Sequence, residues 1–460
     1  MPVPTRCWLV LSPLLSGCPR AEAPCPCDDG HGVTLCEAGE CTPCQCLISA
    51  TPTEDPTPRT TRYVDADVTG GDGTSGSPWT TPDWDVLDDD VADGDVLVIF
   101  NAGGVWPERL DILRTDTGPY RIVLDGHHSR NASGWVDAGD ARAVVPGILT
   151  SYDNVARSRI TVRGFDVTGS KDKGIYWRAG DDVVIENNLV HDNRGTPAIM
   201  LDYASRSGLP STSFVVRNNH VWDQVGECIY IGGAEGHDLD AHEVIVVENN
   251  LIHDCTHPLS TRHDGINIKD RMGSVTVANN VVFNTNWGIE LASPATVTGN
   301  LVFATRSNGI HATDQWGHGL SGLRLEDNVI LDAKEAGIYL NATENAWLDV
   351  TLSRITVIGP RQAAIEVGGE SGIEGVIDDV VLSDAEVGLD AWSPMDFVLG
   401  TCTVHHTDPV GDREFEELAR GCAEADPRFG DLSAPAGPDG VFFTPDDPWV
   451  SAVGGATAMR

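Results

Sequence analysis

Basic residues are scarce in this chain of 460 residues: Lys and Arg number 30 against 69 Asp and Glu, which gives a formal net charge of -39. This balance excludes a nucleic-acid partner, because binding a phosphate backbone depends on Lys and Arg that displace its counterions. Long apolar runs are also missing, so no segment is expected to span a bilayer. Charged residues make up only 22% of the sequence, whereas Gly reaches 49 residues. These proportions favour a strand-rich protein with many turns.

The first residues are similar to a bacterial lipoprotein signal. Arg6 precedes an apolar stretch that ends at Leu15, and Leu15-Ser-Gly-Cys18 resembles the cleavage box of such signals. We expect residues 1–17 to be removed and Cys18 to carry the lipid. The mature protein would then be tethered to the cell envelope, at the outer membrane or the cell surface. The alternative is a chance apolar start followed by a Cys.

A cysteine-dense module follows at residues 18–46. Its six remaining cysteines suit three disulfides in an oxidising compartment, and they are Cys25, Cys27, Cys36, Cys41, Cys44 and Cys46. A zinc site around the Cys41-x-x-Cys44 pair is the alternative. Residues 47–62 are rich in Thr and Pro and have no apolar period, which predicts an extended linker.

One short phrase, of the kind Glu186-Asn-Asn-Leu-Val190, recurs through the middle of the chain. Its second Asn falls at Asn188, Asn219, Asn250, Asn280, Asn300 and Asn328. A unit of this length cannot bury its apolar face alone, so it must stack on copies of itself. We therefore expect a solenoid in which these Asn side chains form a buried, hydrogen-bonded ladder along one turn.

A second phrase, Gly-Ile-x-Ile-x, accompanies the first and predicts another strand in each coil. If the Ile side chains point inward, the third and fifth positions point outward. The third positions include Tyr230, Asn267, Glu290 and His311, and the fifth positions include Asp202 and Lys269. The longest insertions, at 202–213, 232–243 and 254–263, border the same coils, and inserted loops commonly build a binding face. This pattern predicts a groove lined by Asp202, Tyr230, Asp264, Asn267, Lys269, Arg271, Glu290 and His311.

The stretch from Tyr63 through Trp79 to Phe100 resembles the entrance of right-handed parallel β-helix proteins of the pectate-lyase-like superfamily. The Asn-Asn phrases resemble the repeat of the same superfamily. The resemblance implies an all-β solenoid at residues 63–395, with a first strand and a short helix within 81–90 that cap its open end. Residues 396–460 would form an irregular C-terminal cap.

The string Arg262-His-Asp-Gly-Ile-Asn-Ile-Lys-Asp-Arg271 resembles the catalytic coil of family nine pectate lyases. That resemblance implies that Asp264 binds calcium and that Lys269 is the base. The chain departs from the family in the following coil, where one carboxylate, Glu290, replaces a cluster of Asp ligands. Lys269 is one of only four lysines, the others being Lys171, Lys173 and Lys334.

Elimination from a uronic acid removes the proton next to the carboxylate, so a cation must neutralise that carboxylate and a base must accept the proton. Calcium or Arg271 can supply the positive charge, and Lys269 can be the base. An exposed charged turn formed by Lys269, Asp270 and Arg271 is the alternative. In either case Asp202, Tyr230, Asn267, Glu290 and His311 are predicted to bind substrate.

Other features have structural explanations as well as functional ones. A column of rings after the Asn phrase, His191, Trp222, His253, Phe283 and Phe303, can stack sugars or pack under a loop. Asp192 and Asp254 beside two of these rings suggest acid–base pairs, although the repeat alone explains them. Cys228 and Cys255 are either buried or a bridge between coils, and Cys402 and Cys422 suggest a disulfide. An acidic stretch at 437–447 has the oxygen density to hold calcium.

Together these features predict a surface-tethered, monomeric protein that acts on polysaccharide, most specifically a lyase that cleaves an acidic (uronate) polysaccharide by β-elimination. Two alternatives stay open. One is a noncatalytic glycan-binding or structural β-helix lipoprotein. The other is a glycosidase or uronate epimerase, favoured if the carboxylates Asp202, Asp264 and Glu290 converge.

Overall fold

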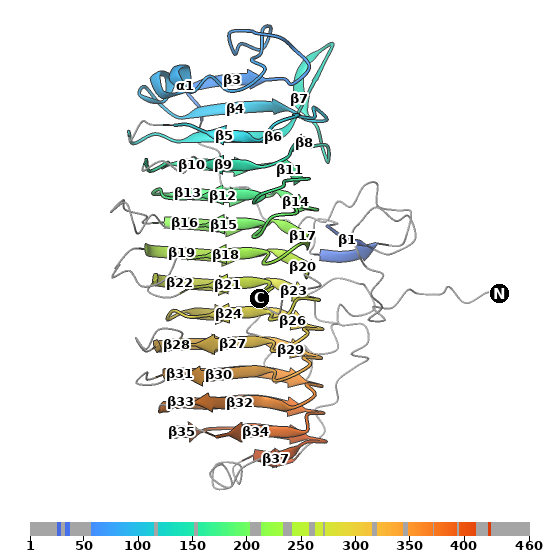
Figure 1. The fold of residues 1–460 in the computed structure, drawn as a ribbon, viewed down its shortest axis with the longest axis vertical. Coiled ribbons are helices and arrows are strands. Elements are labelled where there is room, and N and C mark those ends of the chain that lie inside the picture. Colours follow the sequence, from blue (N-terminus) through green and yellow to red (C-terminus); the bar gives the residue numbers. More distant parts are fainter. Residues whose placement is uncertain are drawn as a thin grey trace, which may run out of the picture.

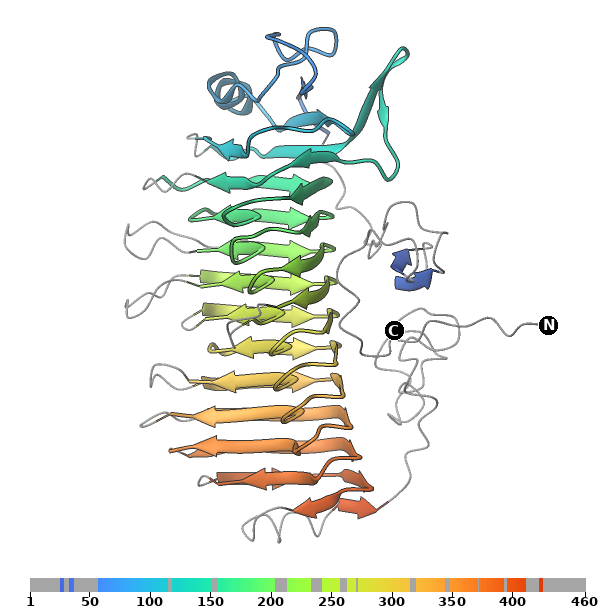
Figure 2. The same ribbon diagram turned by 45° about the vertical axis from the view of Figure 1, so that its right-hand side comes forward.

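The computed structural model describes residues 25–28, 33–36, 57–114, 118–150, 155–202, 213–232, 242–256, 263–269, 272–314, 320–343, 348–370, 372–392, 395–410 and 422–424. Its main body is a stack of coils that runs from the N-terminal cap to the last strands (Figures 1 and 2). The signal, Cys18, Arg271 and the acidic stretch at 437–447 lie outside the described residues. Within the described residues, no helix is long and apolar enough to cross a membrane.

One side of the stack is a sheet of twelve parallel strands, one from each coil. We call it the Ile sheet, because most of its strands begin at the Ile of the Gly-Ile phrase. Its strands are β5 (Leu110–Ile112), β9 (Ile148–Thr150), β12 (Ile175–Trp177), β15 (Ile199–Leu201), β18 (Ile229–Ile231), β21 (Ile266–Ile268), β24 (Ile289–Leu291), β27 (Ile310–Thr313), β30 (Ile338–Ala342), β32 (Ala363–Gly369), β34 (Val387–Ala391) and β37 (Asp408–Val410).

The other sides form a second sheet, which most coils enter twice. Strands before the Asn turn are β3 (Thr60–Val64), β4 (Val96–Asn101), β6 (Ile122–Asn131), β10 (Ile160–Arg163), β13 (Val183–Glu186), β16 (Ser213–Arg217), β19 (His242–Glu248), β22 (Met272–Ala278), β25 (Thr296–Thr298), β28 (Leu320–Glu326) and β35 (Met395–Leu399). Strands after it are β8 (Ala143–Val145), β11 (Phe165–Thr168), β14 (Leu189–His191), β17 (His220–Gln224), β20 (Leu251–Cys255), β23 (Val281–Phe283), β26 (Leu301–Phe303), β29 (Val329–Leu331), β36 (Cys402–His405) and β38 (Cys422–Glu424). Strands β31 (Leu348–Ile358) and β33 (Ile373–Ser383) span both positions.

The Asn ladder is confirmed. Each side-chain amide donates to the next Asn carbonyl oxygen, from Asn188 to Asn219 (3.1 Å) through Asn300 to Asn328 (2.9 Å). All six side chains of the ladder are buried. The preceding residue in the first four phrases, such as Asn187 or Asn249, adopts a positive φ that Asn tolerates better than most residues. The repeated Asn-Asn thus combines a turn former with a ladder member.

The Gly of the Gly-Ile phrase is explained by the corner before the Ile sheet. A Cβ built on Gly265 would lie 2.7 Å from the carbonyl oxygen of Gly288 and would collide with the side chain of Val282. A Cβ built on Gly288, Gly309 or Gly337 would collide with the next coil in the same way. Inside the corner, Ile, Val and Leu side chains form one continuous buried core along the stack.

The N-terminal end is closed by α1 (Trp84–Val91), as predicted. Asp83 caps this helix by accepting a hydrogen bond from the backbone N–H of Val86, and Trp84, Leu87 and Val91 are buried. A hairpin formed by β6 and the antiparallel β7 (Gly134–Asp137) projects beside the cap (Figure 2). A separate pair, β1 (Cys25–Asp28) and β2 (Val33–Cys36), lies in the cysteine module, whose side-chain pairing is outside the described residues.

Two differences from the sequence prediction concern the ends of the solenoid. Parallel pairing begins at Thr60, within the predicted linker, and continues beyond residue 395, through β36 to β38. The predicted irregular cap therefore contains further coils, whose repeats lack the Asn phrase that marks the others. The disulfides Cys228–Cys255 and Cys402–Cys422 are both present.

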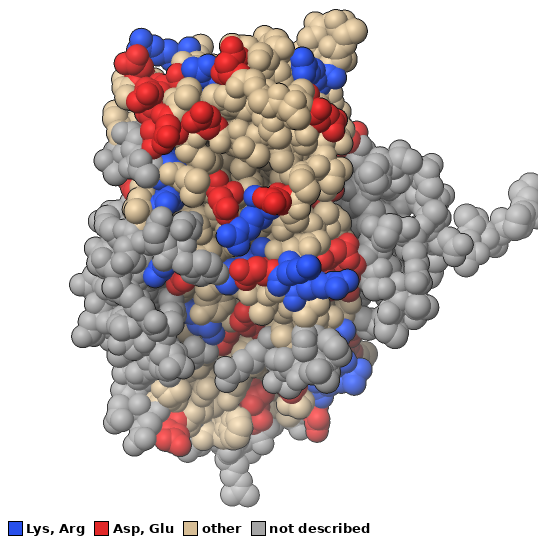
Figure 3. All heavy atoms as spheres, turned by 45° about the horizontal axis from the view of Figure 1, so that its top comes forward, with Lys and Arg blue, Asp and Glu red and all other residues tan. Residues whose placement is uncertain are grey.

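Basic and acidic side chains are mixed on the face shown in Figure 3. Several arginines pair with a carboxylate from another part of the chain, as in Arg62–Asp90 (2.6 Å), Arg163–Asp125 (2.7 Å) and Arg217–Glu186 (2.6 Å). Such pairs fix arginine side chains between neighbouring segments, while the net charge of the chain remains strongly negative.

Candidate functional site: a carboxyl, lysine and histidine cluster on the Ile sheet

The predicted outward column exists in the structure. Strand register places Tyr230, Asn267, Glu290, His311 and Tyr339 side by side on consecutive strands of the Ile sheet. Neighbouring strands lie about 4.8 Å apart, so adjacent members of this column are within reach of one another. The middle members are covered, because Asn267 and Glu290 are each only 1% exposed.

Asp264 lies at the corner before β21, and its side chain turns toward this column. The Asn267 amide donates to its Oδ2 at 2.6 Å, whereas Oδ1 meets no hydrogen-bond donor among the described residues. Burial, followed by the negative charges of Glu290 and Glu227, raises the pKa of Asp264 well above its usual range. Both influences favour the protonated form of Asp264.

Lys269 follows β21 and forms an ion pair with the next coil. Its Nζ donates to Oε2 of Glu290 at 3.0 Å and lies 5.9 Å from the centroid of the Tyr230 ring. A side chain at Gly232, in the preceding coil, would collide with Lys269, so this glycine leaves room for the lysine. The Lys269 side chain retains 16% exposure, while that of Glu290 retains 2%. Lys269 is thus more accessible to solvent than its partner Glu290.

His311 is the next member of the column after Glu290. Its ring packs edge-on against Trp287 (4.6 Å between centroids) and stacks on Tyr339 (5.1 Å). Neither ring nitrogen has a hydrogen-bond partner among the described residues. Burial lowers the pKa of His311 to about 4, so the imidazole is neutral at neutral pH. A neutral imidazole beside a carboxylate is able to accept a proton.

Asp202 does not join the other carboxylates. It follows β15, two strands before Lys269, and its Oδ2 accepts a hydrogen bond from the Tyr176 hydroxyl at 2.9 Å. Two strand spacings amount to roughly 10 Å. Of the three carboxylates whose convergence would favour a glycosidase, the structure brings together Asp264 and Glu290 and leaves Asp202 apart.

Two residues of the cluster were missed by the sequence analysis. Glu227 occupies the position of Asp264 in the preceding coil, and Trp287 occupies it in the following coil. Glu227 lies near Asn267, whose amide nitrogen is 3.5 Å from its Oε1. The signal was present in the residue before each Gly-Ile or Cys-Ile pair. A pattern built on strand positions leaves this residue out, because it belongs to a turn.

The cluster does not fit calcium well. Calcium takes six to eight oxygen ligands, and the buried Oδ1 atoms of Asp264 and Asn267 are the oxygens that lack a donor. However, Glu290 already forms an ion pair with Lys269. Glu227, Asp264 and Glu290 all lie in the described part of the chain, but they do not place one carboxylate oxygen each within 4.8 Å of one another. Lys269 supplies a positive charge beside these carboxyl groups.

The ring column on the second sheet is also confirmed as a stack. His191 lies on Trp222 (4.2 Å between centroids), and His253 follows at 6.3 Å from Trp222. Phe283 and Phe303 continue the stack at steps of 4.7 Å. Trp222 is only 2% exposed, which indicates that the rings pack on one another. Asp192 and Asp254 bind the Nδ1 atoms of His191 and His253 at 2.8 and 2.7 Å.

Comparison with known families adds the handedness of the coil. The family model described as a right-handed β-helix region matches residues 146–317 and 207–376, which together span half of the chain. The chain belongs to this right-handed β-helix family. This confirms the right-handed parallel β-helix expected from the sequence. No curated protein matches the sequence.

Solved structures with a similar course of the chain differ widely in sequence. XylC, solved in complex with xylose, has 11% identity and a TM-score of 0.46, covering 80% of this chain and 87% of its own. PfbA, a surface adhesin of Streptococcus pneumoniae, has 11% identity and a TM-score of 0.44, covering 76% and 93%. A pectate lyase has 13% identity and a TM-score of 0.38, covering 85% and 88%.

Proposed function

We propose that this chain is a carbohydrate-active enzyme of the cell envelope that transfers protons on an acidic polysaccharide, with its site at Asp264, Lys269, Glu290 and His311. The observation that carries the proposal is the Lys269–Glu290 ion pair, enclosed between a carboxyl group and an imidazole on consecutive coils. The rings of Tyr230, Trp287 and Tyr339 border the same cluster, and flat rings are common surfaces for sugars.

β-Elimination is the reaction that this set of groups fits best. The Lys269 ammonium group faces the substrate carboxylate and neutralises it, which makes the neighbouring C–H more acidic. A base takes this proton, the electron pair forms a C=C bond, and the bond to the leaving glycosidic oxygen breaks. We assign to Asp264 the role of the acid that gives that oxygen its proton. The products are two shorter chains, one of which ends in an unsaturated uronate.

The base is assigned to His311 in this scheme, whereas the resemblance to family nine pectate lyases implies Lys269. The ion pair with Glu290 motivates the change, because an amine that donates to a buried carboxylate already bears its proton. Two substitutions separate the schemes. Lys269→Arg preserves the charge but cannot act as a base, so it keeps activity if Lys269 neutralises the substrate and loses it if Lys269 is the base. His311→Gln loses activity if His311 is the base and keeps activity if Lys269 is the base.

The test incubates the purified chain with a panel of uronate polysaccharides, with added calcium and with a chelator, and follows the ultraviolet absorbance of unsaturated products. Calcium binding by Asp264 stays a prediction that the chelator arm decides. His128→Gln, on the N-terminal hairpin, is the matched control for loss of an imidazole. Equal activity in wild type, Lys269→Met and His311→Gln would refute this site. Growth of reducing ends without absorbance would identify hydrolysis in place of elimination.

A noncatalytic glycan-binding or structural role is the second candidate. It is favoured by the burial of Asp264, Asn267 and Glu290, which are 0%, 1% and 1% exposed and so have little direct access to a ligand. Binding of a polysaccharide without any product, unchanged by Asp264→Asn, would support this candidate.

We also propose that Cys18 anchors the protein to the envelope. The support is the sequence Leu15-Ser-Gly-Cys18 behind an apolar stretch. Fractionation of cells that express wild type or Cys18→Ala tests it, since the variant should leave the membrane fraction. Retention of the variant in that fraction would contradict the anchor.

A further inference from the structure

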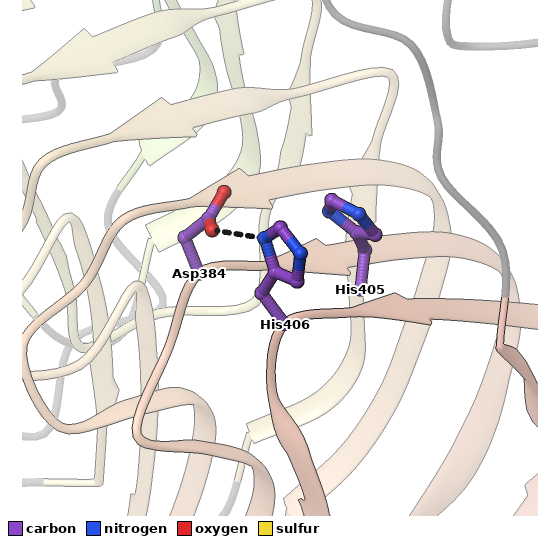
Figure 4. Close-up of side chains that lie close together, drawn as sticks. All are labelled: Asp384, His405 and His406. Carbon is purple, nitrogen blue, oxygen red and sulfur yellow. Dashed lines mark hydrogen bonds and ion pairs between the residues drawn. The ribbon is translucent and has the colours of Figure 1, made fainter.

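The last described coils carry a second cluster of ionisable side chains, far along the stack from Lys269. Asp384 follows β33, and His405 and His406 follow one coil later, at the end of β36 (Figure 4). Ser383 pairs in register with His405, and the backbone N–H of Asp384 donates to the His405 carbonyl at 3.0 Å. Asp384 and His406 therefore occupy the same place in neighbouring coils.

The backbone explains how two consecutive histidines face the same side. Along a strand, adjacent side chains point in opposite directions. His406 leaves the strand with a φ of 47°, and Asp384 has a φ of 55° at the equivalent place. This left-handed turn brings the His406 ring to 3.7 Å from the His405 ring, measured between centroids. Both rings lie beside the Asp384 carboxylate (Figure 4).

The contacts resemble those that orient metal ligands. Nδ1 of His406 lies 3.2 Å from Oδ1 of Asp384. The Ser383 hydroxyl donates to Oδ2 of Asp384 at 2.8 Å and lies 3.3 Å from Nδ1 of His405. One ligand atom from each of Asp384, His405 and His406 falls within 4.8 Å of the other two. Ligand atoms around a tetrahedral ion with bonds of about 2.1 Å are roughly 3.4 Å apart, so small side-chain rotations complete the site.

The composition of the cluster selects the kind of ion. Two imidazole nitrogens and one carboxylate oxygen suit Zn²⁺ and its first-row neighbours, whereas calcium prefers oxygen ligands alone. The side chains of Asp384 and His406 are 48% and 72% exposed, so an ion can enter and water can fill the remaining position. The equivalent pairs in the two preceding coils, Leu331-Asp332 and Ile358-Gly359, contain no imidazole.

We propose that Asp384, His405 and His406 bind a divalent ion of the zinc class, which fastens two neighbouring coils at the C-terminal end of the solenoid. At this location the ion would stabilise the end of the stack. Terminal coils have a neighbour on one side only and are the weakest part of a repeat stack. The disulfide Cys402–Cys422 joins the next pair of strands, β36 and β38, at the same end. The ion and the disulfide together would hold successive coils in register.

Titration of the full chain, purified without a histidine tag, with Zn²⁺ in a calorimeter tests the proposal. A variant that combines Asp384→Asn, His405→Gln and His406→Gln should lose one equivalent of zinc, and each single variant should bind at least about tenfold more weakly. His128→Gln is the matched control and should bind as wild type does. The comparison isolates this site from any zinc held by the cysteine module, which all variants share.

Cobalt supplies an independent signature, because Co²⁺ in a tetrahedral site absorbs visible light strongly while the hydrated ion does not. The band should appear with wild type and disappear in the triple variant. Zinc should also raise the melting temperature of wild type but not that of the triple variant. Equal zinc stoichiometry and equal cobalt spectra in the two proteins would overturn the proposal, as would calcium binding at the same groups in preference to zinc.

Discussion

Replacing Asn250 by Ala should strongly destabilise the solenoid, because this side chain lies in the middle of the ladder and makes five hydrogen-bond contacts. Its amide nitrogen donates to the carbonyls of Val216 and Glu248, both at 3.0 Å, and to Oδ1 of Asn280 at 2.9 Å. Its carbonyl oxygen accepts from the backbone N–H and the amide of Asn219, at 3.0 and 3.1 Å. One side chain thus joins three successive coils.

The magnitude follows from these contacts. The amide has two hydrogens for three acceptors, so the set counts as about four hydrogen bonds. At about 1 kcal/mol of net stability for each, the loss is about 4 kcal/mol. The substitution also leaves the buried N–H of Asn219 without its acceptor, which adds to the loss. A domain stability of about 5–15 kcal/mol makes this a large fraction of the total.

Urea denaturation followed by far-ultraviolet circular dichroism measures the effect. Asn341→Ala is the matched control, since the same atoms are removed from a half-buried side chain whose amide makes a long contact of 3.5 Å with Thr313. We expect the control to cost less than about 1 kcal/mol. A difference below about 1 kcal/mol between the two variants would refute the view that the ladder holds the coils together.

Three further predictions concern the pH dependence of stability, the pH dependence of activity, and a disulfide. Burial lowers the pKa of His191, but hydrogen bonds with Asp166 and Asp192 prevail and raise it to about 9. Its contribution, at most about 3 kcal/mol, is present below about pH 6.5 and is lost as pH rises through about 9. The stability gap between wild type and His191→Gln in melts from pH 6 to 10 should therefore close, and a gap that widens would contradict the pairing. Activity should fall below about pH 4, where His311 gains a proton. It should fall again on the alkaline side, where Asp264 loses its proton. A pH–rate profile that His311→Gln leaves unchanged would exclude His311 as the base. Replacing both Cys228 and Cys255 by Ala should cost about 3–4 kcal/mol for a bridge between residues 27 apart, and after reduction the wild type and the variant should unfold at the same urea concentration.

The proton states in the candidate site depend on contacts between coils. Burial raises the pKa of Asp264, and the negative charges of Glu290 and Glu227, from the coils after and before it, raise it further. His311 is neutral because Trp287 and Tyr339 exclude water from its ring. Each of these neighbours is remote in sequence and adjacent in space. Proton-transfer chemistry on this scaffold is consequently a property of the stack and not of any one repeat.

The sequence by itself determined the solenoid, the Asn ladder, the N-terminal helix and the outward column on the Ile sheet. These features repeat, and a periodic pattern of apolar, Gly and Asn residues reports the same local geometry in every coil. Coil length varies, as the ladder shows with steps from 20 to 31 residues. Only the tertiary structure decided which side chains meet across that variation. It moved Asp202 away from the carboxyl cluster, added Glu227 and Trp287 to it, and brought Asp384 to His405 and His406, because these contacts join residues of different coils that are remote in sequence.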